Sequence, residues 1–294
     1  MHAERDAMRQ NERVPTFTDE HGVDITYDVW PVENARAVVQ IAHGVGEHAQ
    51  RYAELAGHLN DDGFAVYADD HRGHGRTGMA QWHGDSTRLG RLGPGGLRAA
   101  IAAVYQFSGI VRAENADLPL VILGHSWGSF MVQKILDRDS ADYDLAVLSG
   151  SAYRVPGYLN SGDLNKRYAH LGTTGVEWLS RDPQVSQAFV DDPLTTSVPL
   201  AKLFGPMDTL RIIGRPARRL ARDIPLLLQV GSGDTVGGER SVRRLERAYR
   251  ERSGLTDVTT IVYPDARHEI YNETNRAEVM ADLTAWLDAR LALR

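Results

Sequence analysis

The sequence predicts an α/β fold, in which a mostly parallel central sheet carries helices on both faces and an inserted helical cap. Three observations lead to this prediction. Short apolar runs alternate with helical patterns along most of the chain, which is typical of a parallel sheet covered on both sides. One segment, residues 151–222, interrupts the alternation. A G-x-S-x-G pentapeptide lies directly between an apolar run and a helical pattern.

The first half of the chain is expected to form a hairpin followed by alternating strands and helices. Residues 16–17 and 25–30 have strand patterns and flank a turn at His21-Gly22. Further strands are expected at 37–42, 64–68 and 120–123, a loop at 69–75, and helices at 52–59, 95–112 and 130–136. Pro119 ends the connection that leaves the 95–112 helix, because proline cannot continue a helix.

The second half of the chain repeats the alternation around one insertion. Strands are expected at 145–148, 225–230 and 258–263, and a last helix at 276–292. Residues 151–222 contain scattered aromatic residues, prolines and glycines, with helical fragments but no strong strand. Since ligands of such sheets bind at the carboxyl ends of the strands, we expect this segment to form a lid over that edge. A compact second domain is the alternative, and the length of the insertion favours the lid.

The expected domain organisation follows from these elements: a core of residues 14–150 and 223–294, a helical cap of residues 151–222, and a mobile N-terminal arm of residues 1–13. A length of 294 residues allows one large α/β domain or two ordinary ones. The arm is charged and lacks the apolar segment of a signal peptide, and the longest apolar runs are too short for a transmembrane segment. We therefore expect a cytoplasmic protein.

The composition excludes several classes of function. With 42% hydrophobic and 24% charged residues the chain can bury a sizeable core. A net charge of -6 gives no indication of a nucleic-acid partner. The absence of cysteine excludes disulfides, thiolate metal sites and cysteine nucleophiles. The chemistry must therefore rest on other side chains.

Ser126 is the candidate nucleophile, in the pentapeptide Gly-His-Ser-Trp-Gly at 124–128. A serine on a sharp strand-to-helix turn takes a strained backbone conformation that exposes its hydroxyl. Gly124 and Gly128 remove the Cβ atoms that would collide in so tight a turn. The N-terminus of the following helix favours developing negative charge. These features together predict nucleophilic catalysis by Ser126.

A serine hydroxyl needs a base, and the base needs an orienting acid. In hydrolases with a serine on such a strand-to-helix turn, these residues follow the serine in the order acid, then histidine. Asp234 follows the strand at 225–230, and His268 follows the strand at 258–263, so both lie just past strand ends. Asp265 is the rival acid, but it is too close in sequence to His268 to approach it from a separate strand. The expected triad is Ser126, Asp234 and His268.

The oxyanion that forms during acyl transfer needs two backbone N–H donors, one after the nucleophile and one from the loop after the third strand. The first is assigned to Trp127. Residues 43–46, His-Gly-Val-Gly, follow the strand at 37–42, so the second is assigned to Val45. A glycine-rich turn with no such role is the alternative.

Other charged residues have structural interpretations. Glu47 and Arg51 lie four apart at a helix start and suit an intrahelical ion pair. His71 and His74 are metal-ligand types, but no acidic or histidine partner accompanies them at ligand spacing, so no metal site is expected. A helical spacing, typical of a solvated helix face or of an anionic head-group patch, relates Arg211, Arg215, Arg218 and Arg222.

Four motifs carry a family resemblance: HGVGEH at 43–48, DHRGHG at 70–75, GHSWG at 124–128 and RHE at 267–269. In this order they resemble the monoacylglycerol lipase and lysophospholipase branch of the α/β-hydrolase superfamily, over about residues 16–291 and most weakly in the cap. The resemblance implies the α/β-hydrolase fold, no cofactor, and hydrolysis of small esters of a single acyl chain through an acyl-enzyme. It implies Ser126, Asp234 and His268 as the triad.

The substrate pocket is the least defined part of this prediction. Trp127 and Ser129 occupy positions where the branch often carries Met and Gly, and a ring beside the nucleophile is expected to narrow the acyl pocket. The predicted pocket residues are Trp127, Tyr153, Tyr158, Leu159 and Trp178. Transient contact of the cap with a lipid surface is a further expectation. Acyl transfer on the same triad and a non-catalytic ligand-binding protein remain the alternatives.

Overall fold

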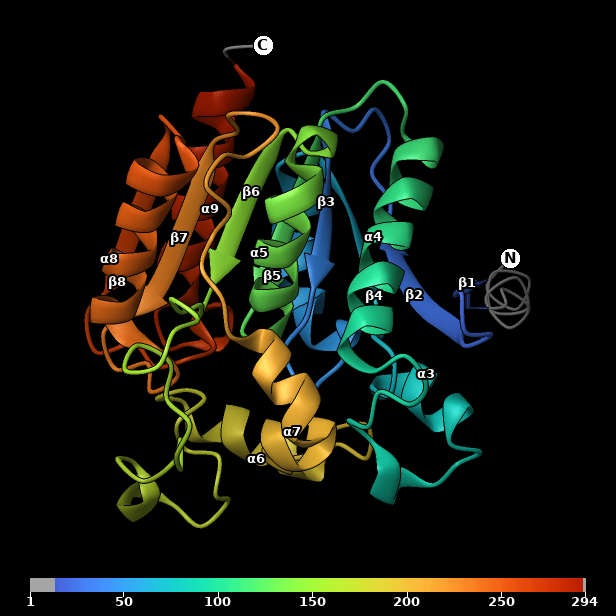
Figure 1. Ribbon diagram of the computed structural model, residues 1–294, viewed down its shortest axis with the longest axis vertical. Helices are drawn as coiled ribbons and strands as arrows, with labels where there is room; N and C mark the ends of the chain where they lie inside the picture. Colours follow the sequence, from blue (N-terminus) through green and yellow to red (C-terminus); the bar gives the residue numbers. More distant parts are fainter. Residues whose placement is uncertain (1–13, 293–294) are drawn as a thin grey trace, which may run out of the picture.

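The computed structural model describes residues 14–292, and within them the chain forms one eight-stranded sheet (Figure 1). The strand order is β1-β2-β4-β3-β5-β6-β7-β8. Strands β3 to β8 run parallel, whereas β1 and β2 add an antiparallel hairpin at one edge. The strands are β1 (Thr16–Thr18), β2 (Asp24–Trp30), β3 (Ala37–Ala42), β4 (Phe64–Asp69), β5 (Leu120–His125), β6 (Leu145–Ser149), β7 (Leu226–Gly231) and β8 (Val258–Tyr263).

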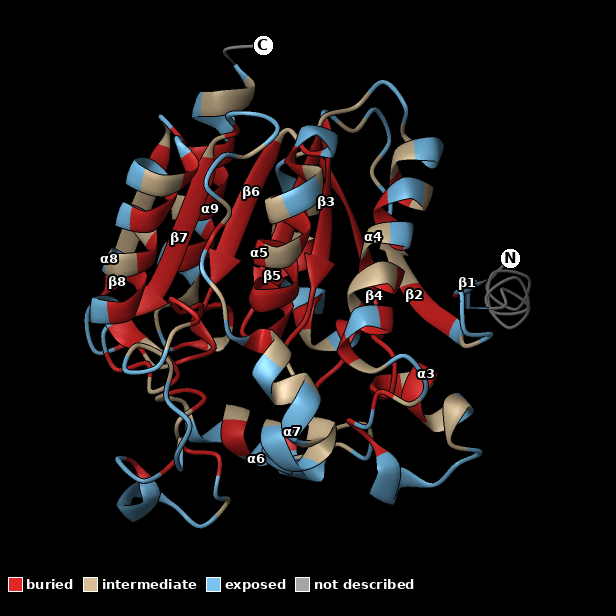
Figure 2. Ribbon diagram, in the orientation of Figure 1, coloured by how far each residue is buried: buried red, intermediate tan, exposed pale blue. Residues whose placement is uncertain are grey.

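Helices cover both faces of the sheet and bury it (Figures 1 and 2). One face carries α4 (Gly96–Glu114), α5 (Trp127–Asp139) and α8 (Gly238–Ala248), and the other carries α2 (Ala53–Asp61) and α9 (Arg276–Leu291). Every residue of β3, β4, β5, β6 and β7 is buried. Strands covered on both sides need apolar residues throughout, which explains the continuous apolar runs of the sequence.

Two further helices, α6 (Pro183–Asp191) and α7 (Leu200–Ile212), lie beyond the carboxyl ends of the strands (Figure 1). Helix α7 is kinked at Gly205, whose φ of 73° is accessible to glycine, directly before Pro206. The short helix α3 (Gly75–Gln81) lies at the same end of the sheet. The remaining short helices are η1 (Ala49–Tyr52), η2 (Ser86–Arg88), η3 (Ser140–Asp142), η4 (Ala169–Leu171), η5 (Tyr249–Ser253) and η6 (Ile270–Asn272).

Two contacts join the segment between α6 and α7 to the loop after β3. The His48 ring nitrogen Nε2 lies 2.8 Å from an Asp192 carboxylate oxygen. The Thr196 amide donates to the Gly46 carbonyl at 2.9 Å. The segment therefore contacts the loop that was predicted to supply one oxyanion donor.

The structure confirms the predicted fold class and all eight strands, with ends that differ by at most two residues. Helices α3 and α8 were not predicted. The prediction that the four arginines lie on one helix is wrong. Helix α7 ends at Ile212, and the chain carrying Arg215, Arg218 and Arg222 is irregular. Pro216 disfavours a helical conformation of Arg215, so a helix does not continue through the arginine repeat.

The predicted N-terminal arm, residues 1–13, lies outside the described residues. Across residues 14–292, none of the helices combines the length and the apolar character that crossing a bilayer requires.

Candidate active site

Ser126 lies at the sharp turn between β5 and α5. Its φ of 52° and ψ of −122° are unusual for a residue with a side chain, and such strain is typical of functional turns. The neighbouring glycines are sterically required. A Cβ atom on Gly128 would lie 2.1 Å from the Ala42 carbonyl oxygen, and one on Gly124 would lie 2.7 Å from the Ser129 Cα. The turn geometry predicted from the pentapeptide is therefore present.

Ser129 supports this turn from the first turn of α5. Its buried hydroxyl donates to the Ser126 carbonyl at 2.5 Å and lies 2.7 Å from the Ser151 hydroxyl. A glycine at this position would lack both bonds. The serine that departs from the family pattern thus has a structural role in holding the carbonyl of the candidate nucleophile.

The structure brings His268 and Asp234 together from the loops after β8 and β7. His268 Nδ1 lies 3.0 Å from Asp234 Oδ2, and both side chains are buried. Because Nδ1 faces the carboxylate, it carries the proton in the neutral ring, and Nε2 is the basic nitrogen. Within residues 14–292, His268 Nε2 is buried without a hydrogen-bond partner, so no hydrogen bond joins it to Ser126 here. Asp265 lies at a turn with a φ of 60°.

Burial and charge act in opposite directions on the His268 imidazole. Burial favours the neutral ring, but the nearby Asp234 carboxylate and its hydrogen bond outweigh it, so the pKa of His268 is raised above its usual value of 6.5. The neighbouring His125 ring lies 4.7 Å from the His268 ring, centroid to centroid. Burial and the proximity of His268 hold the pKa of His125 well below 6.5. His125 therefore stays neutral beside the candidate base.

The two predicted oxyanion donors have unengaged amides near Ser126. Among the described residues, neither the Val45 nor the Trp127 N–H donates to a protein acceptor. Gly44 holds the first of them close, since a Cβ atom there would lie 3.1 Å from the Ser126 Cβ. The adjacent Gly44 amide is different, because it donates to the Glu47 carboxylate at 2.6 Å. Two free backbone donors next to the turn at Ser126 are what an oxyanion site requires.

A buried ion network lies beside these loops, and most of it was not predicted. Arg51 donates to Glu47 at 2.7 Å, as expected for this pair, and also to both carboxylate oxygens of Glu269 at 2.6 and 2.8 Å. Glu47 in turn accepts from the Tyr52 hydroxyl at 2.8 Å. Since Glu269 directly follows His268, the network connects the loop of the candidate base with the loop after β3.

The two carboxylates of this network differ in their pKa values. Burial works to raise the pKa of Glu269, but the charge and hydrogen bonds of Arg51 hold it at about 2. For Glu47 burial prevails, and Glu269 adds to it, so the pKa of Glu47 is raised. The Glu269 charge also contributes to the raised pKa of His268. Arg51 thus stabilises the ionised form of Glu269 most strongly.

Two of the predicted pocket residues lie at the site. The Trp178 ring is 4.7 Å from the His268 ring, centroid to centroid. The Trp127 ring is 5.1 Å from His74 and 5.0 Å from Phe204 of α7. Trp127 is only 1% exposed, and its indole Nε1 has no hydrogen-bond partner among residues 14–292. The ring therefore fills space between α5, the loop before α3 and α7.

The other three predicted pocket residues have different direct partners. Tyr153 and Tyr158 pack edge to face at 5.5 Å, and the guanidinium groups of Arg244 and Arg240 on α8 lie 4.9 Å from their rings. Leu159 forms a bridge with Pro156. Among residues 14–292, no ring contact or hydrogen bond joins these three to Ser126 or His268, so the acyl-pocket prediction finds its geometric support in Trp127 and Trp178.

The histidines that resemble metal ligands have other contacts. His71 Nδ1 lies 2.7 Å from an Asp69 carboxylate oxygen, and His74 Nδ1 lies 2.8 Å from the Arg72 carbonyl. The His71 ring stacks on His43 at 3.9 Å. In the part of the chain that the structure describes, no group of three or more metal-ligand side chains could hold an ion.

Comparison with known proteins is consistent with this site. A family model described as "Serine aminopeptidase, S33" matches residues 33–275. The chain is 32% identical to a monoacylglycerol lipase of Mycolicibacterium smegmatis, covering 94% of this chain and 97% of that protein. It is 25% identical to the monoglyceride lipase of Mus musculus, over 89% of this chain and 86% of that protein.

Solved structures extend the similarity to the whole fold. A thermostable carboxyl esterase from Bacillus coagulans, in complex with glycerol, superposes with a TM-score of 0.82 at 25% identity, covering 95% of this chain and 98% of the esterase. The strand order, the strained turn at Ser126 and the relatives thus all indicate the same superfamily. The chain belongs to the monoacylglycerol lipase branch of the α/β-hydrolase superfamily and is a carboxylic ester hydrolase.

Proposed function

We propose that this hydrolase cleaves monoacylglycerols and similar small esters of a single acyl chain, with Ser126, His268 and Asp234 as its catalytic triad. The observation that carries the proposal is the 3.0 Å contact of His268 with Asp234, combined with the strained φ of 52° at Ser126. The substrate class comes from the relatives, several of which are named monoacylglycerol or monoglyceride lipases.

The proposed reaction has two half-reactions that share one set of groups. Ser126 Oγ attacks the acyl carbonyl carbon while His268 Nε2 takes its proton. His268 then gives that proton to the leaving glycerol oxygen, and the acyl chain remains as an ester on Ser126. In the second half, water loses a proton to Nε2 and attacks the acyl-enzyme, and the same proton returns to Ser126 Oγ. The fatty acid leaves and the enzyme is regenerated.

The other groups of the site orient the His268 ring and stabilise the charges that develop during the reaction. Asp234 holds the Nδ1 proton and stabilises the imidazolium that forms in each half-reaction. The free amides of Val45 and Trp127 are proposed to donate to the oxyanion. Removal of one such donor typically costs about 10²- to 10³-fold in kcat.

Residues 151–222 are proposed as a cap over this site. In support, α6 and α7 lie beyond the carboxyl ends of the strands (Figure 1), and Phe204 and Trp178 reach Trp127 and His268. Exposed apolar side chains on α7, Met207 at 62% and Leu210 at 66%, suit transient contact with a lipid surface. A cytoplasmic location is part of the same proposal.

The substrate proposal is tested by comparing a monoacylglycerol, a diacylglycerol and p-nitrophenyl esters of increasing chain length as substrates. We expect turnover of the monoacylglycerol to exceed that of the diacylglycerol. Adding glycerol or another alcohol separates hydrolysis from acyl transfer, because a transferase would convert the acyl-enzyme to a new ester. Equal turnover of mono- and diacylglycerol would contradict a single-chain pocket.

A further inference from the structure

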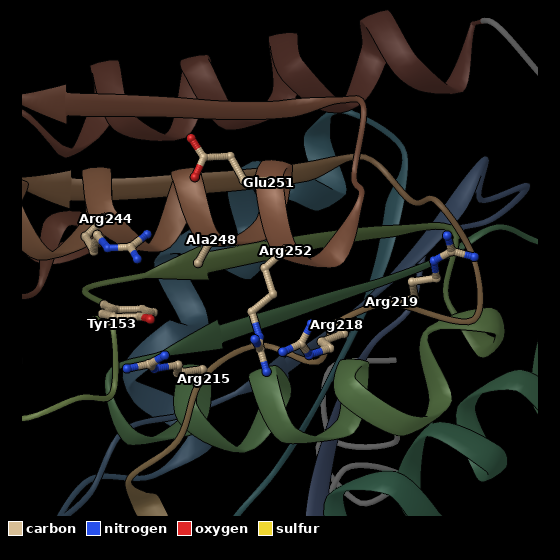
Figure 3. Close-up of a pocket in the computed structure, with 8 residues that line it drawn as sticks. All are labelled: Tyr153, Arg215, Arg218, Arg219, Arg244, Ala248, Glu251 and Arg252. Atoms are coloured by element: carbon tan, nitrogen blue, oxygen red, sulfur yellow. The ribbon is translucent and has the colours of Figure 1, made fainter.

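One cavity is lined mainly by arginines and by none of the residues assigned to the candidate active site other than Tyr153 (Figure 3). Its volume is about 730 Å³, within the range of small-molecule sites. The lining residues are Tyr153, Arg215, Arg218, Arg219, Arg244, Ala248, Glu251 and Arg252. None of the proposed triad residues is among them.

The cavity is built from three parts of the chain. Tyr153 follows β6, the irregular segment 213–222 follows α7, and the remaining residues belong to α8 and η5. The segment is fixed to its neighbours: the Ala217 amide donates to Asp137 at 2.6 Å, and the Ser253 hydroxyl donates to the Ala217 carbonyl at 2.7 Å. The arginines of segment 213–222 are thus attached to an anchored backbone.

The charges of the cavity are not balanced within the protein. Five arginines and one glutamate line it, although the chain as a whole has a net charge of -6. Among the described residues, none of the five forms an ion pair with a carboxylate. Asp137, whose carboxylate accepts from the Ala217 amide, is 3.6 Å from the buried Arg154 and interacts with Arg252 only through the charge, without an ion-pair contact. The concentration of positive charge is therefore open to an external anion.

The orientations of the side chains agree with this. In Figure 3 the Arg218 and Arg252 side chains extend toward one another, Arg215 extends the other way, on the side of Tyr153, and the Glu251 carboxylate points away from them. Arg252 uses its Nε to donate to the Pro216 carbonyl at 2.6 Å, which leaves its terminal nitrogens for a ligand. Arg244 packs on the Tyr153 ring at 4.9 Å, a contact that leaves the guanidinium edge free.

We propose that this cavity binds a ligand that carries several clustered phosphate groups. A guanidinium pairs with phosphate oxygens through two parallel hydrogen bonds, and it keeps its charge at all physiological pH values. Five such groups exceed what one carboxylate or one inorganic phosphate can engage, and the cavity is larger than either. A soluble polyphosphorylated metabolite and a multiply phosphorylated lipid head group share this chemistry.

The test uses tripolyphosphate as the soluble probe, measured by isothermal titration at low salt. For the lipid source, co-sedimentation compares vesicles of phosphatidylcholine alone with nine-to-one vesicles of phosphatidylcholine and phosphatidylinositol bisphosphate. The test variant is Arg215→Gln with Arg218→Gln, two exposed side chains for which the described structure shows no hydrogen bond or ion pair. The control, Arg98→Gln with Arg247→Gln, removes the same charge from exposed positions on α4 and α8 outside the cavity.

We expect the parent protein to bind one of the two probes at a single site, and its melting temperature to rise with tripolyphosphate if the soluble probe is the ligand. The test variant should bind at least roughly tenfold more weakly, because two charge-assisted contacts are lost. The control should bind like the parent. Binding that is absent for both probes, or equally weakened in the control, would overturn the proposal and indicate solvated arginines. Ester turnover of both variants, expected to equal that of the parent, verifies folding.

Discussion

His268 is the residue whose environment most directly controls activity in the proposed mechanism. It must be neutral to accept the serine proton, and its pKa is raised because the Asp234 charge and hydrogen bond outweigh the effect of burial. A raised pKa means that the ring stays protonated to higher pH. Activity should therefore be low in acid and rise with pH as the proton is lost.

The pH profile is the first prediction. We expect kcat/KM to rise through a midpoint above about pH 6.5, the ordinary value of histidine. An optimum near pH 4 to 5 in an enzyme that remains folded would instead indicate a protonated acid as catalyst.

The His268 ring should also respond to the loss of its partner. Asp234→Asn should lower kcat by something like 10⁴, because the carboxylate that holds the correct ring tautomer is removed.

The second prediction concerns the buried Arg51. Replacing it by Met removes the cation that neutralises Glu269, and leaves two carboxylates, Glu47 and Glu269, buried together. We expect a loss of about 3 to 5 kcal/mol in the free energy of unfolding, measured in urea. The control is Arg276→Gln, which breaks an exposed pair with Glu54 and should cost less than about 1 kcal/mol. Equal losses in both variants would contradict a special role of burial.

At the scale of elements, the end of β6 packs against the His125 and His268 rings. Gly150 follows this strand with a φ of 54°, and a Cβ atom there would lie 2.9 Å from both His125 and His268. No alanine fits without moving one of the rings. The strand end thus limits where the His268 ring can lie.

Gly150→Ala is the third prediction. Displacement of His268 by a fraction of an ångström to one ångström should lower kcat by about ten- to a hundredfold. The matched control is Gly157→Ala, since Gly157 has a φ of 86° and a Cβ atom there would meet nothing within 4 Å. It introduces backbone strain without the clash, so its kcat should be nearly unchanged. Similar losses of kcat in both would attribute the effect to strain alone.

Helices α5 and α7 meet at the Trp127 and Phe204 rings, which are 5.0 Å apart. The fourth prediction is that Trp127 limits the acyl chain. Since each buried methylene is worth about 0.8 kcal/mol, kcat/KM should rise roughly three- to fourfold per carbon until the pocket is full. Trp127→Met should move the optimum of p-nitrophenyl esters to longer chains. A chain-length preference that is flat in the parent, or unmoved in the variant, would contradict this pocket.

The elements that could be predicted are those with a strong local signal. Strands β3 and β8 were predicted with their observed bounds: β3 is a parallel strand buried along its length, and β8, at the sheet edge, is rich in β-branched residues. Helix α8 was missed although its polar and apolar residues alternate with helical period. The arginine repeat at 211–222 has the same period but is irregular. Periodicity alone therefore does not distinguish α8 from segment 213–222, where Pro216 and contacts from distant segments determine the backbone.

At the scale of the whole molecule, the candidate site combines the loops that follow β3, β5, β6, β7 and β8. Chain order predicted Ser126, Asp234 and His268, because each follows a strand. It could not predict the bidentate contact of Arg51 with Glu269, since these residues are 218 positions apart. Nor could it place Tyr153, which lies at the arginine-lined cavity. Side chains in irregular segments are positioned by packing that a sequence pattern does not contain.

The whole molecule also separates two kinds of surface. The apolar residues Met207 and Leu210 are exposed on α7, beyond the carboxyl ends of the strands. The arginines of the arginine-lined cavity lie between α8 and segment 213–222 on one face of the sheet. An acyl ester and a phosphate-bearing ligand would therefore bind at separate places, and variants of one place should leave the other functional.

The central claim is that Ser126 is the nucleophile, and one measurement tests it most directly. The parent protein is treated with a fluorophosphonate and the labelled residue is identified by mass spectrometry, with Ser126→Ala and the exposed Ser161→Ala assayed in parallel. We predict a single phosphonylated residue, Ser126, no label in Ser126→Ala, and a loss of roughly 10³-fold or more in its kcat for a monoacylglycerol, with Ser161→Ala unaffected. Label on another residue, or near-normal turnover by Ser126→Ala, would contradict the account.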